Sequence, residues 1–211
     1  TGQTRFADDI MLPRMVHCKL LRSILPHARI VRIDTTRARA LDGVHLVLTG
    51  ADFPIPYGIL PVSQDEHALA NDRVRFVGDP VAAVIARDEL TAVEALDLID
   101  VEYEPLRTFS GPDDSLAHGE PRIHEYGSSG NIHKAVSLGF GHVEHAFADA
   151  DEVFEDTFFY QGSTHLPIEQ HAAVAAKDPD GKLVLWSATQ TPHYVHRALA
   201  KALEMPAAHV R

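Results

Sequence analysis

The stretch that most constrains the fold runs from Arg73 to Leu106, where apolar runs and a helical pattern alternate with short connections. Its first part, "RVRFVGDPVAAVIA", holds two apolar runs separated by Gly78-Asp79-Pro80, and the proline cannot donate to a strand ladder. We therefore predict a bulge or tight turn at this tripeptide. Asp88 is placed to cap a helix, after which "IDVEYEPL" predicts another strand. The expected apolar face of this helix consists of Leu90, Val93, Leu96 and either Ala92 or Ile99.

The preceding residues predict the other elements of the same domain. "MVHCKLLRS" and "HARIVRID" predict two strands joined by a turn around Pro26, and Cys18 is expected to be a buried thiol. "DTTRARALDG" predicts a short helix that ends at Gly43, and "VHLVLTG" predicts a half-buried strand. Residues 51–72 are expected to form a loop. Together, residues 1–110 predict an α+β domain with its helices laid on the sheet.

The composition changes between residues 111 and 145. This segment is rich in Gly, Ser, Pro, Asp and His and lacks periodicity, so we expect a linker. Residues 146–211 are expected to begin a second domain. In it, "HAAVAAKDPDGKLVLWSAT" predicts a hairpin around the turn "DPDG". "PHYVHRALAKAL" predicts a helix with Pro192 at its first position, where a missing amide hydrogen costs nothing.

Charge and cysteine content exclude several classes of partner. The 211 residues include 19 Lys and Arg against 30 Asp and Glu, a formal net charge of −11, which repels nucleic acid and anionic membranes. No apolar run approaches the roughly 20 residues of a membrane span, and no secretory signal is visible, so we expect a cytoplasmic protein. One cysteine excludes an intrachain disulfide and an iron–sulfur cluster held by this chain alone. The initial Thr and the ending "LEMPAAHVR" suggest a piece of a longer protein.

Histidine pairs are the first candidates for chemistry. His142 and His145 are spaced i, i+3, as are His193 and His196, but no third ligand accompanies either pair. Because catalytic zinc normally takes three protein ligands, we expect no metal bound by these histidines and treat them as surface or supporting groups. The sequence also lacks G-x-S-x-G, G-x-G-x-x-G and a P-loop lysine.

Glu169 and His171 are the second candidates. They lie two residues apart in a predicted strand, so their side chains would point to the same side. This spacing leaves two interpretations open, an acid/base pair and a hydrogen-bonded pair that faces a neighbouring strand.

Several segments, taken in order, carry a resemblance to a known family. Residues 1–34, 43–52 and 71–106 resemble the α/β hammerhead domain that opens the large subunit of molybdenum hydroxylases, the xanthine dehydrogenase and aldehyde oxidoreductase family. The family forms are T-G-x-A-x-Y-x-x-D, R-S-x-x-A-H-A-x-I and V-x-x-x-G-[QED]-P-V-A-x-V. The matching residues are Thr1, Gly2, Asp9, Arg22, Ser23, His27, Ala28, Ile30, Gly78, Asp79, Pro80, Val81, Ala82 and Val84. The departures, Thr4, Phe6 and "ILP", are conservative enough for packing roles.

Residues 151–206 resemble the start of the molybdopterin-binding domain, so the resemblance covers nearly the whole chain. Within the family, residues 57–84 and 188–196 most resemble the α subunit of 4-hydroxybenzoyl-CoA reductase, which removes an aromatic hydroxyl reductively from an aryl-CoA thioester. The alternatives are an aldehyde, xanthine or N-heterocycle dehydrogenase, and a hammerhead scaffold without chemistry of its own.

The resemblance implies cofactors and partners. We expect molybdopterin cytosine dinucleotide, shared with a part of the subunit that this chain does not contain, and FAD and iron–sulfur clusters on partner subunits. A ferredoxin-type electron carrier and a small aromatic substrate, such as an aryl-CoA, complete the expected partners. The chain alone is expected to be inactive, because the glycine-rich cofactor loops and the catalytic glutamate of the family lie outside it.

The resemblance also implies site residues. In this family the glutamine of a Thr-Gln pair reaches the apical oxo group of molybdenum, and that role falls on Gln190 with Thr189 as its neighbour. A neutral amide can hydrogen-bond an oxo group without adding a charge that would shift the potential of the metal. The helix that begins at Pro192 would point its positive end toward the anionic cofactor. The alternative is that Gln190 only caps this helix, although Thr191 also suits the cap.

Glu169 and His171 match family positions that line the substrate cavity without acting as the catalytic base. They are therefore expected to border the substrate, and no residue of this chain is expected to be catalytic.

Overall fold

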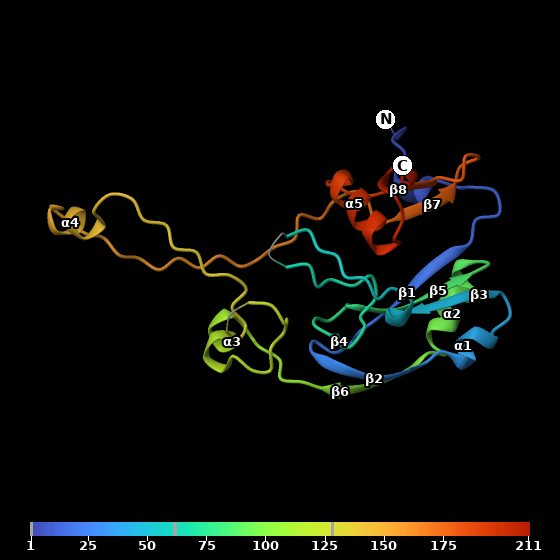
Figure 1. The fold of residues 1–211 in the computed structure, drawn as a ribbon, viewed down its shortest axis with the longest axis horizontal. Helices are drawn as coiled ribbons and strands as arrows, with labels where there is room; N and C mark the ends of the chain where they lie inside the picture. The colour runs from blue at the N-terminus through green and yellow to red at the C-terminus, as the bar shows by residue number, and fades with distance from the viewer. Residues whose placement is uncertain (1, 61–62, 128) are drawn as a thin grey trace.

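The computed structural model describes residues 2–60, 63–127 and 129–211 (Figure 1). Thr1 of the first family motif, Pro61 and Val62 within residues 57–84, and Ser128 of the expected linker lie outside these ranges. Strands and helices are interspersed through residue 105, and a strand hairpin and a helix follow further along the chain. This order confirms the predicted α+β class.

The first sheet consists of three antiparallel strands in the order β1–β5–β3, namely β1 (His17–Arg22), β5 (Pro80–Ala86) and β3 (Val44–Thr49). The helices α1 (Thr36–Ala40) and α2 (Glu89–Leu96) pack against this sheet. The core between helices and sheet is made of small side chains that are completely buried. They are Ala38, Val47, Val84, Ala86, Ala92 and Ala95.

Helix α2 begins as predicted but presents a partly different face to the sheet. The Asp88 carboxylate accepts the Thr91 N–H at 2.8 Å, and this bond lowers the pKa of Asp88. The expected face is confirmed only in part. Ala92 is completely buried, and Leu96 and Ile99 pack against the core. Leu90 and Val93 are wrong, because their side chains are 70% and 45% exposed. The completely buried Ala92 and Ala95 allow the helix axis to approach the strands closely, and Leu90 and Val93 lie on the outside.

The expected burial of Cys18 is also wrong. Along β1, His17 and Lys19 face α2, where the Lys19 ammonium lies 2.8 Å from the Glu89 carboxylate. Because side chains alternate along a strand, Cys18 points to the opposite face and is exposed.

The second sheet is also antiparallel, with the order β4–β2–β6, namely β4 (Arg73–Val74), β2 (Ala28–Asp34) and β6 (Asp100–Pro105). Ala28, Val74 and Val81 are buried between this sheet and the start of β5. Of the second family motif, Ser23 bonds both backbone groups of Leu25, and Nδ1 of the buried His27 lies 2.9 Å from the Arg107 carbonyl.

The predicted turn at Gly78-Asp79-Pro80 is confirmed. It carries the chain from β4 in one sheet to β5 in the other, and Gly78 adopts a φ of 97°, a region that favours glycine. The Asp79 carboxylate accepts the Arg75 N–H at 3.0 Å. Burial raises the pKa of Asp79, with the Arg75 bond acting in the opposite direction.

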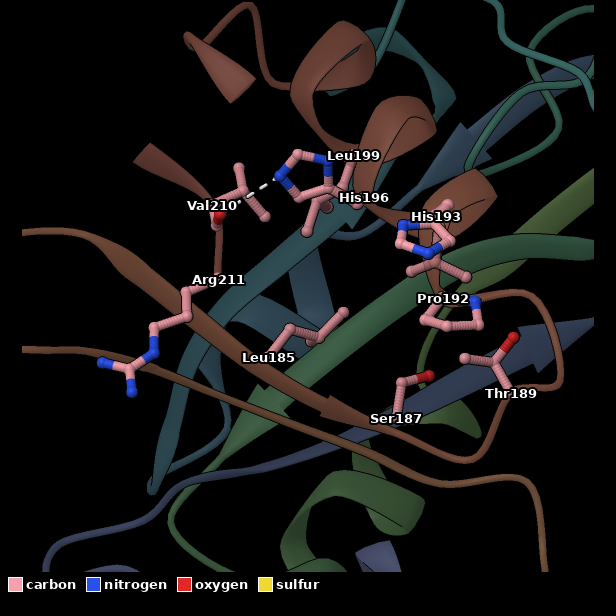
Figure 2. Close-up of a pocket in the computed structure, with 10 residues that line it drawn as sticks. Leu185, Ser187, Thr189, Pro192, His193, His196, Leu199, Val210 and Arg211 are labelled. Carbon is pink, nitrogen blue, oxygen red and sulfur yellow. Dashed lines mark hydrogen bonds between the residues drawn. The ribbon is translucent and has the colours of Figure 1, made fainter. Parts of the chain in front are cut away.

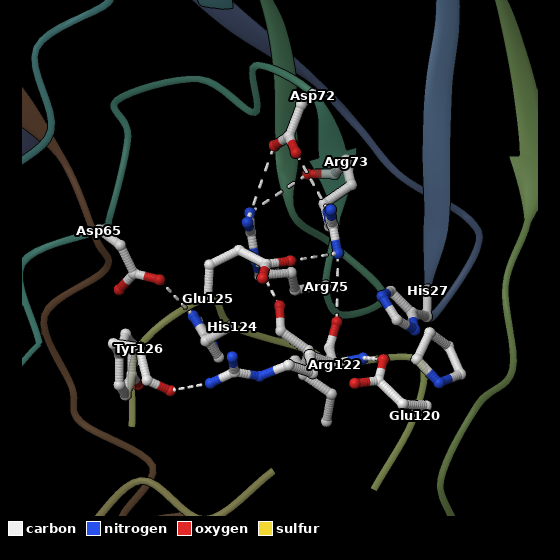
Figure 3. Close-up of polar contacts among 12 residues, drawn as sticks. His27, Asp65, Asp72, Arg73, Arg75, Glu120, Arg122, His124, Glu125 and Tyr126 are labelled. Atoms are coloured by element: carbon white, nitrogen blue, oxygen red, sulfur yellow. Dashed lines mark hydrogen bonds and ion pairs between the residues drawn. The ribbon is translucent and has the colours of Figure 1, made fainter. Parts of the chain in front are cut away.

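The expected linker contains regular structure that its composition did not predict. Helix α3 (Pro112–His118) lies within it, and α4 (Val143–Ala148) crosses its predicted end. Arg75 donates to the Ile123 carbonyl at 2.8 Å, and Arg73 donates to the Arg122 carbonyl at 3.1 Å. Arg73 is the first residue of β4 and Arg75 directly follows this strand, and together they hold residues 122–125 against it (Figure 3).

Further polar contacts fix the same segment. His124 lies 2.7 Å from the Asp65 carboxylate, and Arg73 lies 3.3 Å from the Glu125 carboxylate (Figure 3). The Arg73 side chain is only 14% exposed, so its charge is well shielded from water. This part of the linker is therefore fastened to the first domain.

From residue 134 to residue 172 the chain makes a long excursion with α4 at its tip (Figure 1). The chain then forms the antiparallel hairpin of β7 (Ala173–Lys177) and β8 (Leu183–Ser187). The predicted hairpin turn is confirmed, with Gly181 at φ 81° donating to the Asp178 carbonyl at 2.9 Å. Helix α5 (Pro192–Ala202) follows, with Pro192 at its start as predicted.

Short 3-10 helices complete the structure. They are η1 (Ala7–Asp9), η2 (Gly50–Asp52) and η3 (Ala207–His209). Among the described residues, none of the helices has both the length and the apolar character that crossing a membrane requires.

Candidate functional site

The candidate site lies where β8 gives way to α5. The Ala188 N–H donates to the Ala172 carbonyl at 3.0 Å, which extends the β7–β8 ladder by one step. Three residues then separate this step from α5. Thr189 and Gln190 lie in the junction, and Thr191 is the residue immediately before the helix.

A hydroxyl group shapes this junction. The Thr189 Oγ1 accepts the Thr191 N–H at 3.1 Å and lies 3.4 Å from the Thr191 hydroxyl. The Thr191 carbonyl in turn accepts the N–H groups of Tyr194 and Val195 at 3.0 and 3.2 Å. Such a side-chain turn is a common way for threonine to fix a short connection. It defines the backbone on both sides of Gln190.

Gln190 itself is exposed, and its side chain makes no hydrogen bond among the residues that the structure describes. The helix has no side-chain cap, so the alternative in which Gln190 caps α5 does not describe this structure. The amide is therefore held on a defined turn with its donors and acceptor free for another group.

A cavity of about 330 Å³ lies beside this turn, between β8 and α5. Its floor is apolar, with Leu185, Val195 and Leu199, while Thr189 and His193 contribute polar groups. Figure 2 shows Thr189, Pro192 and His193 at one end of the cavity and Val210 at the other. Gln190 is not among the lining residues.

His196 fixes the far end of this cavity. Its Nε2 lies 2.9 Å from the Ala207 carbonyl and 3.1 Å from the Val210 carbonyl, so Nε2 carries the hydrogen and donates. Val210 and Arg211 run parallel to β8, and the Leu185 N–H donates to the Arg211 carbonyl at 2.8 Å. His196 thus fastens the end of the chain to α5.

The structure does not bring Glu169 and His171 together as predicted. Neither lies in a strand, because β7 begins only at Ala173. The half-buried Glu169 accepts the Ala7 N–H of η1 at 3.1 Å, so its carboxylate joins the end of the excursion to the N-terminal region. His171 is exposed.

No group of three or more His, Cys, Asp or Glu side chains suited to a metal ion occurs within residues 2–60, 63–127 and 129–211. Two of the spaced histidines have other contacts. His145 lies 3.3 Å from Asp149, and His196 bonds the carbonyls described above.

The comparison with protein families identifies both parts of the chain. Residues 1–107 match the family described as aldehyde oxidase and xanthine dehydrogenase, a/b hammerhead domain, and residues 123–211 match the molybdopterin cofactor-binding domain. The chain belongs to the aldehyde oxidase and xanthine dehydrogenase family. Its order of domains is the order predicted from the sequence.

Relatives in this family cover the whole chain. The nicotinate dehydrogenase large molybdopterin subunit of Eubacterium barkeri is 38% identical over 100% of this chain and 49% of the relative. The xanthine dehydrogenase molybdenum-binding subunit of Escherichia coli is 33% identical over 100% of this chain and 29% of the relative. The chain therefore spans about half the length of the first relative and less of the second.

A solved structure agrees with the fold. Quinoline 2-oxidoreductase from Pseudomonas putida 86 is 35% identical and superposes with a TM-score of 0.86 over 99% of this chain and 28% of that chain. The described arrangement is thus shared with a solved member of the family.

Sequence reasoning missed the cavity and the role of His196. The apolar spacing of Val195 and Leu199 along α5 could have indicated a buried face beside β8. The bonds of His196 to two carbonyls near the end of the chain could not have been found, because they depend on the path of residues 203–211.

Proposed function

We propose that this chain is part of the molybdenum-cofactor subunit of an oxidoreductase that hydroxylates aldehydes, purines or other N-heterocycles. The observation that carries this proposal is the free amide of Gln190, held on the turn that Thr189 closes at the end of β8. The matching families and the names of the relatives support the reaction class.

The residues present fit a molybdopterin cofactor. Such a cofactor is anionic and bears oxo groups, so neutral hydrogen-bond donors suit it better than additional carboxylates do. The junction offers the Gln190 amide, the Thr189 hydroxyl and the first turn of α5, and no acidic residue lies in that turn. When bound, the cofactor would supply the two-electron chemistry. Gln190 would orient and hydrogen-bond its oxo group, and Thr189 would hold the turn.

The remainder of the subunit would complete the site. Phe140, Phe158 and Phe159 in the excursion are 91%, 91% and 88% exposed in this chain. Aromatic side chains so exposed normally mark an interface, and the relatives extend well beyond the matched length. We propose that the rest of the subunit covers the excursion and contributes the other cofactor contacts and the substrate pocket, with Glu169 and His171 near its border.

The proposed assembly includes partner subunits with FAD and iron–sulfur clusters. This chain has one cysteine, so electrons from a bound molybdenum centre would have to leave through clusters held by other chains or segments. We further propose the cytosine dinucleotide form of the cofactor and a position of the enzyme in the cytoplasm.

The test uses the full-length subunit purified with its partners. Metal analysis should find molybdenum, and assays with xanthine, nicotinate, quinoline and an aldehyde should show oxidation of at least one of them. An assembled complex without molybdenum would leave only the alternative of a scaffold.

4-Hydroxybenzoyl-CoA reductase activity is the second candidate. It rests on the resemblance of residues 57–84 and 188–196, whereas the relatives described above favour oxidation of N-heterocycles. Reduction of 4-hydroxybenzoyl-CoA by reduced ferredoxin, without oxidation of the four substrates above, would reverse this preference.

A further inference from the structure

A second cavity of about 330 Å³ lies away from the Thr189 turn, between residues 57–59 and 64 of the hammerhead domain on one side and α5 on the other. The loop side contributes Tyr57, Ile59 and Gln64, and the helix side contributes Tyr194, Arg197 and Lys201. The Lys201 ammonium donates to the Gln64 side-chain oxygen at 3.3 Å, which joins the two sides. The cavity therefore has walls from both family domains.

The helix wall is cationic. Tyr194, Arg197 and Lys201 are spaced i, i+3 and i+7, which places them along one face of α5. Neither Arg197 nor Lys201 has a carboxylate within ion-pair distance among the described residues. Although the whole chain has a net charge of −11, Arg197 and Lys201 make the α5 side of the cavity attractive to an anion.

Aromatic rings stand on both walls. The Arg197 guanidinium lies 4.7 Å from the centre of the Tyr194 ring, which orients the cation over an aromatic face. On the loop wall, Tyr57 is half-buried and forms two backbone bonds with Glu66 at 2.8 and 3.0 Å, so its position is fixed. Burial and then the Glu66 and Asp79 carboxylates raise the pKa of Tyr57, so its hydroxyl remains a donor at neutral pH.

The backbone at Gly58 is closely packed. A side chain at Gly58 would come within 2.5 Å of the Ser63 carbonyl oxygen, so the position does not admit a larger residue without a backbone shift. Gly58 and the Ser63 backbone therefore lie close together on this side of the cavity.

We propose that this cavity binds an aromatic ring that carries a carboxylate or a phosphate. The anionic group would lie between Arg197 and Lys201, and the ring would pack against the tyrosines. Charged donors and ring faces together recognise this class of ligand, and the volume is at the small end for ligand sites. A small aromatic acid and a mononucleotide share this chemistry. The inference does not depend on the proposed reaction.

The experiment measures binding to the full-length complex by equilibrium dialysis with three probes, AMP, nicotinate and inorganic phosphate. At least one ring-bearing probe should bind more tightly than phosphate. Arg197→Gln and Lys201→Gln should each weaken that binding about 10- to 100-fold, because each removes a charged donor. Tyr194→Leu should weaken the ring-bearing probe but not phosphate.

Lys177→Gln is the matched control, because it removes the same charge from β7, away from this cavity. Each variant should keep the melting temperature of the parent complex, which separates loss of the site from loss of the fold. Phosphate binding as tight as that of both ring-bearing probes, binding that none of the three cavity variants changes, or no binding of any probe would each overturn the proposal. Nicotinate could also bind at the molybdenum site, so nicotinate binding that only Gln190→Ala weakens would count against this cavity.

Discussion

Replacing Thr189 by valine tests how the turn presents Gln190. Valine keeps the branched shape of threonine but removes the oxygen that accepts the Thr191 N–H at 3.1 Å. A neutral hydrogen bond of this kind contributes about 0.5–1.5 kcal/mol. Its loss should lower the ratio of the turn conformation to alternative backbone conformations by about 2- to 13-fold. Turnover of the full-length complex should fall by about the same factor, with nearly unchanged molybdenum content.

The assay is steady-state turnover on the best substrate, together with the same substitution in a Gln190→Ala background. If Thr189 acts only through Gln190, the double variant should be no slower than Gln190→Ala alone. Thr189→Ser should restore most of the activity, because serine supplies the same acceptor. A Thr189→Val substitution that slows both backgrounds equally would refute the idea that Thr189 positions Gln190. It would favour a direct contact between the Thr189 hydroxyl and the cofactor instead.

Three further substitutions probe the first domain. Asp79→Asn keeps an acceptor for the Arg75 N–H but removes a buried charge whose pKa is raised. The folded parent holds the Asp79 proton more tightly than the unfolded chain does, so the stability of the parent should fall as the pH rises above the ordinary pKa of Asp. The variant has no such proton and should lack this loss. In melting curves from pH 4 to 7, the stability of the variant relative to the parent should therefore increase with pH. Val84→Ala should lower the free energy of unfolding by about 2–3 kcal/mol and the melting temperature by about 4–12 °C, because Val84 is completely buried. A decrease of less than one degree would show that the core relaxes around the gap. Arg73→Met should speed proteolytic cleavage near residues 122–125, whereas Arg29→Met, which removes an exposed ion pair, should not. Equal cleavage rates in the two variants would show that the attachment of this segment does not depend on Arg73.

Local rules predicted the elements that depend on neighbouring residues. The cap at Asp88 and the turns at Gly78 and Gly181 follow from side-chain oxygens and from glycine conformations that can be seen in a few residues of sequence. The strand at β5 follows from an unbroken apolar run that is buried on both sides.

The errors came from features that depend on distant packing. Leu90 and Val93 are larger than Ala92 and Ala95, yet the alanines face the sheet because only they permit a close approach of α2. The composition of residues 111–145 indicated a linker, but Arg73 and Arg75 fasten part of it through backbone carbonyls. Carbonyl acceptors are present at every residue, so no sequence pattern identifies which ones are used.

The candidate site also contains features that the sequence predicted and features that depend on distant contacts. The Thr-Gln pair was singled out because a family resemblance implied a role for it, and the structure adds a bond between Thr189 and Thr191 that fixes the backbone around Gln190. Glu169 was placed in a strand, but it bonds Ala7 from the other end of the chain. This contact spans most of the sequence, and local periodicity contains no information about it.

The most direct test of the central claim is the turnover of the full-length complex that carries Gln190→Ala, normalised to its molybdenum content. If the Gln190 amide hydrogen-bonds a molybdenum-bound group, the variant should assemble, retain molybdenum and turn over about 10- to 100-fold more slowly. Turnover per molybdenum equal to that of the parent would contradict this role for Gln190.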